Sequence, residues 1–271
     1  MRDSLYENIQ FKVSELTHHY GPNVHLVGNP YLLSQLARLC AKGTFQPQIN
    51  RLVATLYTDL VKLVMNAEFP RKPAVIPTRM VDSTPLGIYQ GEVIDPEVRA
   101  VSVNIARAGT LPSQVTYDLM NTILSPALVR QDHIIMSRML DQAEKVVGSN
   151  IGGSKIGGDV DDAIVIFPDP MGATGGSLST AIRMYKDKVP GRMRKTICLN
   201  LIVTPEYVRR ITVDHPDVVV YAIRLDRALS PPEVFGTAPG KLWDRERGLD
   251  DRQYIVPGGG GMGELMNNAY V

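Results

Sequence analysis

The spacing of apolar residues predicts helices in the N-terminal part of the chain. Apolar side chains recur three and four residues apart over 32–40 and again over about 47–67, which is the period of one helix face. Asn29 suits a helix cap, and Pro30 suits the first helical position. We therefore expect residues 24–70 to form a helical segment, preceded by an N-terminal addition of residues 1–23.

Beyond a proline-rich stretch with short β-rich runs, the pattern changes to short, continuous apolar runs that are typical of buried strands. These predicted strands cover 98–106, 134–137, 163–167, 197–203 and 218–223. Helices are predicted between them, over 113–128, over 178–185 and from a Thr204-Pro205 start. Strands that alternate with helices indicate βαβ units and a parallel sheet flanked by helices. We expect one α/β domain over residues 1–271, with its core sheet in 98–225.

Composition and charge narrow the class of protein. The chain has 271 residues, with 29 Lys plus Arg against 28 Asp plus Glu, so the broad basic surface of a nucleic-acid-binding protein is not expected. No apolar stretch approaches the length of a membrane span, and the N-terminus lacks the apolar region of a signal peptide. The two cysteines, Cys40 and Cys198, are too far apart for a metal knuckle or a redox pair. We expect a cytoplasmic protein without a membrane partner or a nucleic-acid partner.

The segment over 163–177 carries most of the chemical information. An apolar strand runs into Asp169, and a turn of Thr174, Gly175, Gly176 and Ser177 leads into a helix. Ligands of open α/β sheets bind beyond the carboxyl ends of the strands, and backbone N–H groups at a helix N-terminus suit a phosphate. Asp169 can accept hydrogen bonds from sugar hydroxyls. A phosphate beside hydroxyls predicts a ribose 5-phosphate site, and the alternative is a tight strand-to-helix turn without a ligand.

Two other phosphate-binding motifs fit this chain poorly. A Walker A loop requires Gly-Lys-Ser/Thr, and the turn over 172–177 has no lysine. The GxGxxG pattern of dinucleotide-binding proteins is met by Gly258, Gly260 and Gly263. The eight residues that follow Gly263 are too few for the helix and return strand of that motif, so we interpret the match as an accident of a glycine run.

The same segment resembles a known family. Asp169-Pro-Met-Gly-Ala-Thr-Gly-Gly-Ser177 is similar to the phosphoribosyl diphosphate (PRPP) loop of the uracil phosphoribosyltransferases, in its Asp-Pro-Met form. Three more stretches agree in order: Ile105–Gly109, Met136–Arg138 and Tyr254–Gly258. The resemblance covers roughly residues 24–268. It implies the type I phosphoribosyltransferase fold, a parallel sheet flanked by helices with a small hood or arm.

The resemblance also implies roles for individual residues. Asp169 would hold the ribose hydroxyls and Arg107 the pyrophosphate, and these two would be the catalytic residues. The implied PRPP site comprises Arg107, Arg138, Asp169, Pro170, Met171, Gly172, Ala173, Thr174, Gly175, Gly176, Ser177 and Gly261. The base would contact Tyr254, Ile255, Gly260, Gly261 and Met262 within the segment 254–268. Mg²⁺ would arrive bound to PRPP, and no metal site made by the protein alone is expected.

The implied reaction transfers the phosphoribosyl group of PRPP to uracil, giving UMP and pyrophosphate. The family commonly forms dimers or tetramers, and the resemblance leaves GTP binding open. The sequence departs from the family at Gly261, where an aspartate is usual, at Met262, and at Glu264, where a second aspartate is expected. Two alternatives therefore stay open: a phosphoribosyltransferase for another base, and a non-catalytic sensor of PRPP or nucleotides. The glycine-rich stretch 148–158 has two interpretations, a lid over the site or a linker.

Overall fold

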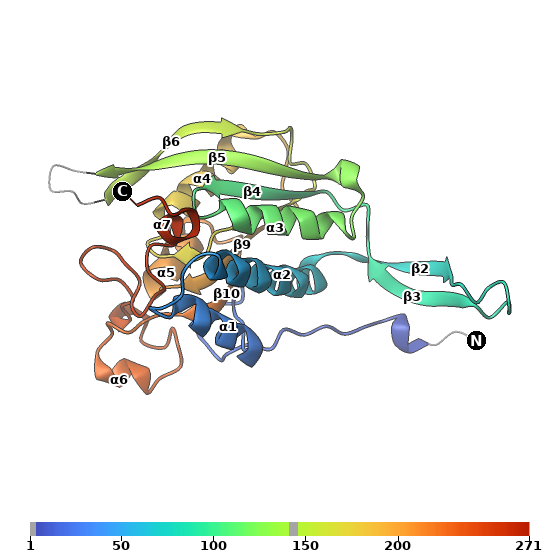
Figure 1. The fold of residues 1–271 in the computed structure, drawn as a ribbon, viewed down its shortest axis with the longest axis horizontal. Helices are drawn as coiled ribbons and strands as arrows, with labels where there is room; N and C mark the ends of the chain where they lie inside the picture. The colour runs from blue at the N-terminus through green and yellow to red at the C-terminus, as the bar shows by residue number, and fades with distance from the viewer. Residues whose placement is uncertain (1–3, 141–145, 271) are drawn as a thin grey trace.

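The protein is built on one central sheet that is almost entirely parallel (Figure 1). A computed structural model describes residues 4–140 and 146–270. The strand order is β1-β10-β9-β7-β4-β5-β6, with the short β8 beside β9, and only the β5–β6 pair of this order is antiparallel. The strands are β1 (Val24–Leu26), β4 (Ala100–Ala106), β5 (Val129–Leu140), β6 (Val146–Lys155), β7 (Ile164–Pro168), β8 (Met171–Gly172), β9 (Lys195–Val203) and β10 (Val219–Leu225). The expected α/β class, a mostly parallel sheet flanked by helices, is confirmed.

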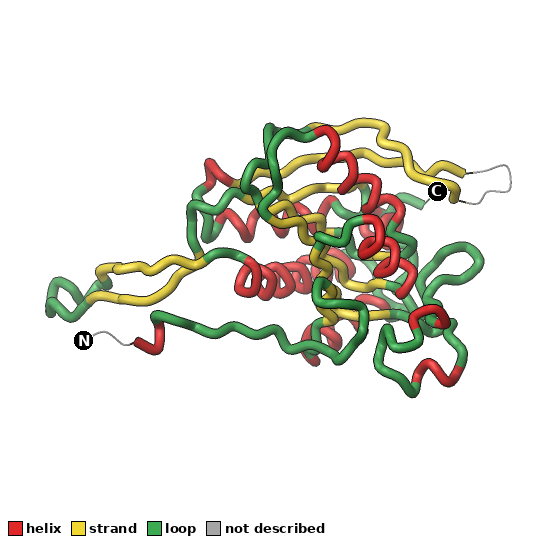
Figure 2. The backbone as a smooth tube through the Cα atoms, turned by 180° about the vertical axis from the view of Figure 1, so that it is seen from behind, coloured by secondary structure: helices red, strands yellow, loops and turns green. Residues whose placement is uncertain are grey.

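Helices cover both faces of the sheet. The helices are α1 (Pro30–Cys40), α2 (Gln48–Glu68), α3 (Thr110–Asn121), α4 (Gly176–Lys188), α5 (Pro205–Asp214), α6 (Pro232–Phe235) and α7 (Met262–Asn267). Alternate residues of β7 divide between the faces: Ile164 and Ile166 pack in the cluster of α1–α3, whereas Val165 and Phe167 pack in the cluster of α4 and α5. Figures 1 and 2 show these two layers from opposite sides. Burial on both faces explains why the strands read as continuous apolar runs.

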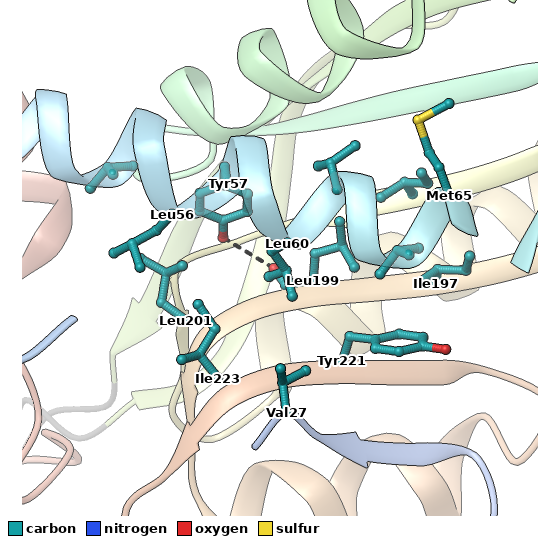
Figure 3. Packing of buried hydrophobic residues seen from close by; sticks show 14 of the residues in the cluster. Val27, Leu56, Tyr57, Leu60, Met65, Ile197, Leu199, Leu201, Tyr221 and Ile223 are labelled. Atoms are coloured by element: carbon teal, nitrogen blue, oxygen red, sulfur yellow. Dashed lines mark hydrogen bonds between the residues drawn. The ribbon is translucent and has the colours of Figure 1, made fainter. Parts of the chain in front are cut away.

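The longest helix, α2, supplies much of the first face. Leu56, Tyr57 and Leu60 are fully buried against β9 and β10 (Figure 3). Each fully buried side chain of this size contributes roughly 1.5–3 kcal/mol relative to an exposed one. The helix thereby fixes the position of β9, whose neighbours β7 and β10 lead into the candidate site.

The two predicted helix starts are confirmed. The Asn29 side chain accepts hydrogen bonds from the backbone N–H groups of Tyr31 and Leu32, at 3.0 and 3.2 Å, and α1 begins at Pro30. Thr204 Oγ1 accepts a hydrogen bond from Tyr207 N at 3.0 Å, and α5 begins at Pro205. In both cases the cap satisfies amides that have no partner within the helix.

Several predicted boundaries were wrong. Segment 24–70 begins with a strand, β1, because Val24 and Leu26 are buried where this part of the chain pairs with β10. The helix expected over 113–128 ends at Asn121, and a separate 3-10 turn, Pro126–Leu128, follows it. The strand expected over 134–137 is the much longer β5. Within 148–158, residues up to 155 form β6 rather than an irregular linker, because their backbone pairs with β5.

A second, two-stranded sheet extends away from the body of the molecule. It consists of β2 (Arg71–Pro77) and β3 (Ile88–Ile94), which pair antiparallel from Arg71–Ile94 to Pro77–Ile88. Figure 1 shows this hairpin at the end of the molecule opposite α7, with the N-terminal segment running beside it. Over the part of the chain that the structure describes, no helix has the length and apolar character needed to cross a membrane.

Candidate active site

The turn after β4 brings Arg107 to the carboxyl-end edge of the sheet. β4 ends at Ala106, the peptide bond between Ala106 and Arg107 is cis, and α3 begins at Thr110. A Cβ atom at Gly109 would lie 2.6 Å from the Ile105 carbonyl oxygen and 3.2 Å from that of Pro168. Only glycine therefore permits this turn to lie so close to the end of β7.

Asp169 follows β7 directly and is fixed by its backbone. Its N–H donates to the Leu199 carbonyl oxygen at 3.0 Å, which also accepts the Tyr57 hydroxyl at 3.1 Å (Figure 3). Its carbonyl oxygen accepts from Asn200 Nδ2 at 2.7 Å, and Asn200 Oδ1 accepts the Tyr207 hydroxyl at 2.8 Å. Sequence reasoning missed the three side chains of this network, Tyr57, Asn200 and Tyr207, because each lies inside an otherwise apolar helix face or strand.

The negative charge of Asp169 affects the pKa values of two buried tyrosines. Burial raises the pKa of the Tyr57 hydroxyl well above its usual value, and the nearby negative charge of Asp169 adds to this rise. Burial likewise raises the pKa of Tyr207, again with a smaller contribution from Asp169. Both hydroxyls therefore stay protonated and act as hydrogen-bond donors at any physiological pH.

The predicted phosphate loop, residues 170–177, packs against α5. A Cβ at Gly172 would lie 2.9 Å from the Tyr207 ring and from Val203 Cγ1. The carbonyl oxygen of Ala173 accepts the Thr204 hydroxyl at 2.6 Å, and Asp169 Oδ1 accepts the Met171 N–H at 3.1 Å. The backbone of this loop is thus held from both sides before any ligand binds.

The loop then enters α4 without a capping side chain. Gly175 is the cap residue and has a φ of +75°, a left-handed conformation that favours glycine. Thr174 Oγ1 accepts the Gly176 N–H only at 3.4 Å. The N-terminus of α4 thus places the positive end of the helix dipole at the edge of the sheet, a geometry that suits a phosphate.

The predicted base-binding residues lie in a compact loop. Tyr254 is 48% exposed, and its N–H donates to Asp250 Oδ1 at 2.8 Å. Ile255 is partly buried against the core of α1–α3. Gly260 has a φ of +81°, so a side chain there would strain the backbone. Met262 is buried in the core, so only its backbone can face a ligand.

An ion pair between the buried Asp226 and the partly buried Arg224, which sequence reasoning missed, holds this loop in place. Arg224 binds Asp226 with two hydrogen bonds, Nε to Oδ1 at 2.6 Å and Nη2 to Oδ2 at 2.7 Å. Asp226 Oδ2 also accepts the Gly258 N–H at 2.7 Å, and Arg224 Nη2 donates to the Gly258 carbonyl oxygen at 3.0 Å. Cys40 Sγ lies 3.9 Å from Arg224 Nη1, and burial raises the pKa of its thiol. The only sequence signal was an arginine and an acid two residues apart at a strand end.

The three predicted parts of the site meet at one edge. The Arg107–Gly109 turn lies against the end of β7, as Gly109 shows. A Cβ at Gly259 would lie 3.5 Å from Met171 Cε, so the base loop touches the phosphate loop. Arg107 Nη2 donates to Glu264 Oε1 at 3.1 Å, which joins the Arg107 turn to the chain after the base loop. The resulting ring of loops combines a guanidinium, helix-end amides, a carboxylate and glycine-rich backbone.

Comparison with known proteins identifies the family to which this chain belongs. The family model described as uracil phosphoribosyltransferase matches residues 27–245. The chain belongs to this family. Uracil phosphoribosyltransferase of Rhodococcus jostii is 30% identical over 244 residues, covering 90% of this chain and 97% of the relative. That of Dictyoglomus thermophilum is 30% identical over 243 residues, covering 90% and 98%. The solved structure of protein AQ2163 from Aquifex aeolicus has a TM-score of 0.68 at 20% identity, covering 92% of this chain and 99% of that one.

Family membership makes the chain a pentosyltransferase-type enzyme, and the chemistry that it supports is PRPP-dependent phosphoribosyl transfer. The structure brings the loops around Arg107, Asp169 and Tyr254, which were predicted from the sequence, together at one edge of the sheet. Arg138 is different, because β5 does not end there but continues to Leu140. Its backbone pairs with Ser149 on β6, and its side chain lies outside what the structure describes.

One cavity lies away from this site, and the site has no preformed metal cluster among the described residues. A cavity of about 480 Å³ lies elsewhere, between β6 and the end of α4, and its lining includes Ile156, Met184 and Lys188 but none of the predicted site residues. Across residues 4–140 and 146–270, no group of three or more His, Cys, Asp or Glu side chains is arranged to hold a metal ion.

Proposed function

We propose that this protein transfers the phosphoribosyl group of PRPP to uracil, forming UMP and pyrophosphate. The observation that carries the proposal is the meeting of Arg107, Asp169 and the amides of α4 beside the glycine-rich loop 254–263. Relatives named uracil phosphoribosyltransferase cover nine-tenths of the chain, which supports the choice of base. The reaction breaks the bond between C1 of the ribose and the pyrophosphate oxygen, and it joins C1 to N1 of the base, which loses its proton.

Each part of the site has a task in this reaction. The amides of Gly176, Ser177 and Leu178 would bind the 5-phosphate at the positive end of α4. Asp169 would accept hydrogen bonds from the ribose hydroxyls and thereby orient C1. Arg107 would bind the pyrophosphate and stabilise the charge that develops as it leaves. No protein nucleophile is required, because the sugar passes through a cationic, oxocarbenium-like state and catalysis depends on positioning and charge stabilisation.

The donor set at this edge fits a magnesium ion that is carried by PRPP. Mg²⁺ is commonly held by one or two carboxylates together with substrate phosphates rather than by an all-protein cage. Asp169 offers such a carboxylate at the ribose side of the site. When bound, the ion would neutralise charge on the pyrophosphate oxygens. Arg107 holds the same oxygens from the protein side.

The loop 254–263 would recognise the base through its backbone. Tyr254 and Ile255 precede a glycine run whose N–H and C=O groups can reach the hydrogen-bonding edge of a planar pyrimidine. The conformation of Gly258 is already set by Arg224 and Asp226, so this surface is formed before the base binds. Preorganisation of this kind reduces the entropy lost on binding.

The test is incorporation of radiolabelled uracil with PRPP and Mg²⁺, combined with an Asp169→Asn variant. The variant keeps the side-chain shape but removes the charge that accepts the hydroxyl hydrogen bonds. Such bonds to a charged group contribute roughly 1.5–3 kcal/mol, so PRPP affinity is expected to fall about 10- to 100-fold in calorimetry. Asp162→Asn is the matched control, because Asp162 is an exposed acid just before β7, at the other end of the same strand. Unchanged PRPP affinity in Asp169→Asn would refute the loop assignment.

A second candidate is favoured by one observation, the glycine at position 261. The uracil phosphoribosyltransferases usually carry an aspartate there, so a different base is the main competitor. The same assay run with cytosine, adenine, guanine and hypoxanthine separates the two candidates. Conversion of one of these bases in preference to uracil would reassign the substrate. PRPP binding without conversion of any base would indicate a sensor. We further propose a cytoplasmic homo-oligomer, a dimer or tetramer, which sedimentation would test.

A further inference from the structure

The Glu264 side chain bridges the two loops that would hold PRPP and the base. Its Oε1 atom accepts a hydrogen bond from Arg107 Nη2 at 3.1 Å. Its Oε2 atom lies beside Gly261, and a Cβ atom added at position 261 would overlap it. The carboxylate therefore fills the space that any side chain at position 261 would need.

The backbone of Gly261 does not itself require a glycine. Its φ of −75° and ψ of 88° are open to other residues, in contrast to Gly258 and Gly260 with φ of +61° and +81°. The absence of a side chain at position 261 is therefore explained by space rather than by conformation. The space is taken by the Glu264 carboxylate.

Helix α7, which carries Glu264, is firmly anchored. Met262 and Met266 are 2% and 6% exposed and belong to the core of α1–α3. Gln46 Nε2 donates to the carbonyl oxygens of Leu265 and Met266 at 3.1 and 3.0 Å, and Asn50 Nδ2 donates to that of Met266 at 3.2 Å. Glu264 thus projects toward Arg107 from a fixed support.

Arg107 keeps donors for a ligand while it is held. A guanidinium has five N–H donors. Here Nη2 donates once to Glu264, and Nη1 donates once to the Ala269 carbonyl oxygen at 3.4 Å. Three donors remain, which is enough for the two parallel hydrogen bonds that a diphosphate accepts. The side chain is about half exposed, so it would otherwise sample several rotamers.

We propose that Glu264 is a positioning residue, which orients Arg107 for the pyrophosphate group of PRPP from a space that Gly261 leaves open. This inference rests on the proposed function for its ligand. The carboxylate holds the guanidinium toward the site, so that less rotamer freedom is lost when the diphosphate binds. Gly261 and Glu264 act as one unit, since the first residue makes room for the second.

The experiment measures binding of pyrophosphate and of ribose 5-phosphate separately by calorimetry, with the full chain. Glu264→Ala is expected to weaken pyrophosphate binding about threefold to tenfold, the cost of ordering one long side chain. Glu264→Gln, which keeps an acceptor, should lose less. In the proposed site ribose 5-phosphate would contact Asp169 and the α4 amides but not Arg107, so its affinity should stay the same. A merely structural role would weaken both ligands together.

Gly261→Ala supplies the second arm. The added Cβ would displace the Glu264 carboxylate, so this variant should weaken pyrophosphate binding as much as Glu264→Ala does. The double variant should be no weaker than either single one, because both changes remove the same contact. Glu233→Ala is the control, since Glu233 on α6 forms an exposed pair with Arg245 and its loss should change neither affinity.

The outcomes separate this inference from the proposed function. Unchanged or tighter pyrophosphate binding in Glu264→Ala, or additive losses in the double variant, would overturn the role of Glu264 whatever base is used. A wild-type protein that binds pyrophosphate but converts no base would remove the proposed reaction and leave the role of Glu264 standing. A wild-type protein that does not bind pyrophosphate would overturn both.

Discussion

The phosphate loop and the base loop of this protein are held by different means. Residues 170–177 are held by the start of α5, through a hydrogen bond from Thr204 to Ala173 and packing of Tyr207 against Gly172. Residues 254–263 are held by Arg224 at the end of β10, by Asp226 just after it and, through α7, by Gln46 before α2. One loop is supported by ring packing and a neutral hydrogen bond, and the other mainly by hydrogen bonds to charged side chains.

The difference explains how each loop responds to change. Packing contacts are individually weak and spread over many atoms, so a local change is partly absorbed. Buried charged contacts are few and directional, and the loss of one partner leaves the other without compensation. We therefore expect the base loop to be the more fragile of the two, although the phosphate loop carries the more recognisable sequence.

The largest effect is expected from breaking the Arg224–Asp226 pair. Asp226 is 2% exposed, and Asp226→Ala would leave the Gly258 N–H without its acceptor and the Arg224 guanidinium without its carboxylate partner. Breaking such a buried pair costs about 3–5 kcal/mol of unfolding free energy. Urea unfolding measures the loss, and the affinity for the base should fall in the same variant. Asp159→Asn, in an exposed pair with Arg99, should leave unfolding unchanged. Equal losses of unfolding free energy in the two variants would contradict the role of the Arg224–Asp226 pair.

The distance along the chain between interacting residues decides what could be predicted from the sequence. The strand into Asp169, the glycine turn and the capped helix starts at Asn29 and Thr204 are signals within a few residues, and the structure has them as expected. The clamp of Arg224 and Asp226 on Gly258 joins residues over 30 apart in the chain, and no periodicity reveals it. The strand β1 was missed for the same reason, since three residues form a strand only because β10 lies beside them.

An intermediate effect is expected from filling the phosphate loop. Gly172→Ala places a methyl group 2.9 Å from the Tyr207 ring and from Val203, so the loop or α5 must shift. Overpacking of this kind costs typically 1–3 kcal/mol, and both the melting temperature and the affinity for ribose 5-phosphate should fall. Gly176→Ala is the matched control for stability, because its Cβ would meet only Thr174 Oγ1, at 3.6 Å. If Gly172→Ala melts no lower than Gly176→Ala, the packing account of this loop is wrong.

The smallest expected effect is a pH dependence confined to the phosphate side. His215 lies under the first turn of α4, where its Nε2 is 3.0 Å from the Ser179 carbonyl oxygen and 3.1 Å from Ser179 Oγ. Burial lowers the pKa of His215 below its usual 6.5. The unfolded chain therefore takes up a proton as the pH falls below 6.5 while the folded protein resists it, so the free energy of unfolding decreases in that range. Hydrogen exchange of the α4 amides at pH 7.5 and 5.5 would report the loosening.

His215→Gln tests this assignment, because a glutamine amide can still donate to Ser179 but does not titrate. The variant should lose less unfolding free energy than the wild type between pH 7.5 and 5.5. Asp214, whose pKa is lowered by its hydrogen bond from Ser179, titrates below its usual 3.8 and lies outside this window. His18 is the internal comparison, since burial lowers its pKa too, and His18→Gln should leave exchange at α4 unchanged. None of the side chains named above as holding the base loop is a histidine, so its exchange should follow neither variant. A pH response there would remove the contrast between the two loops.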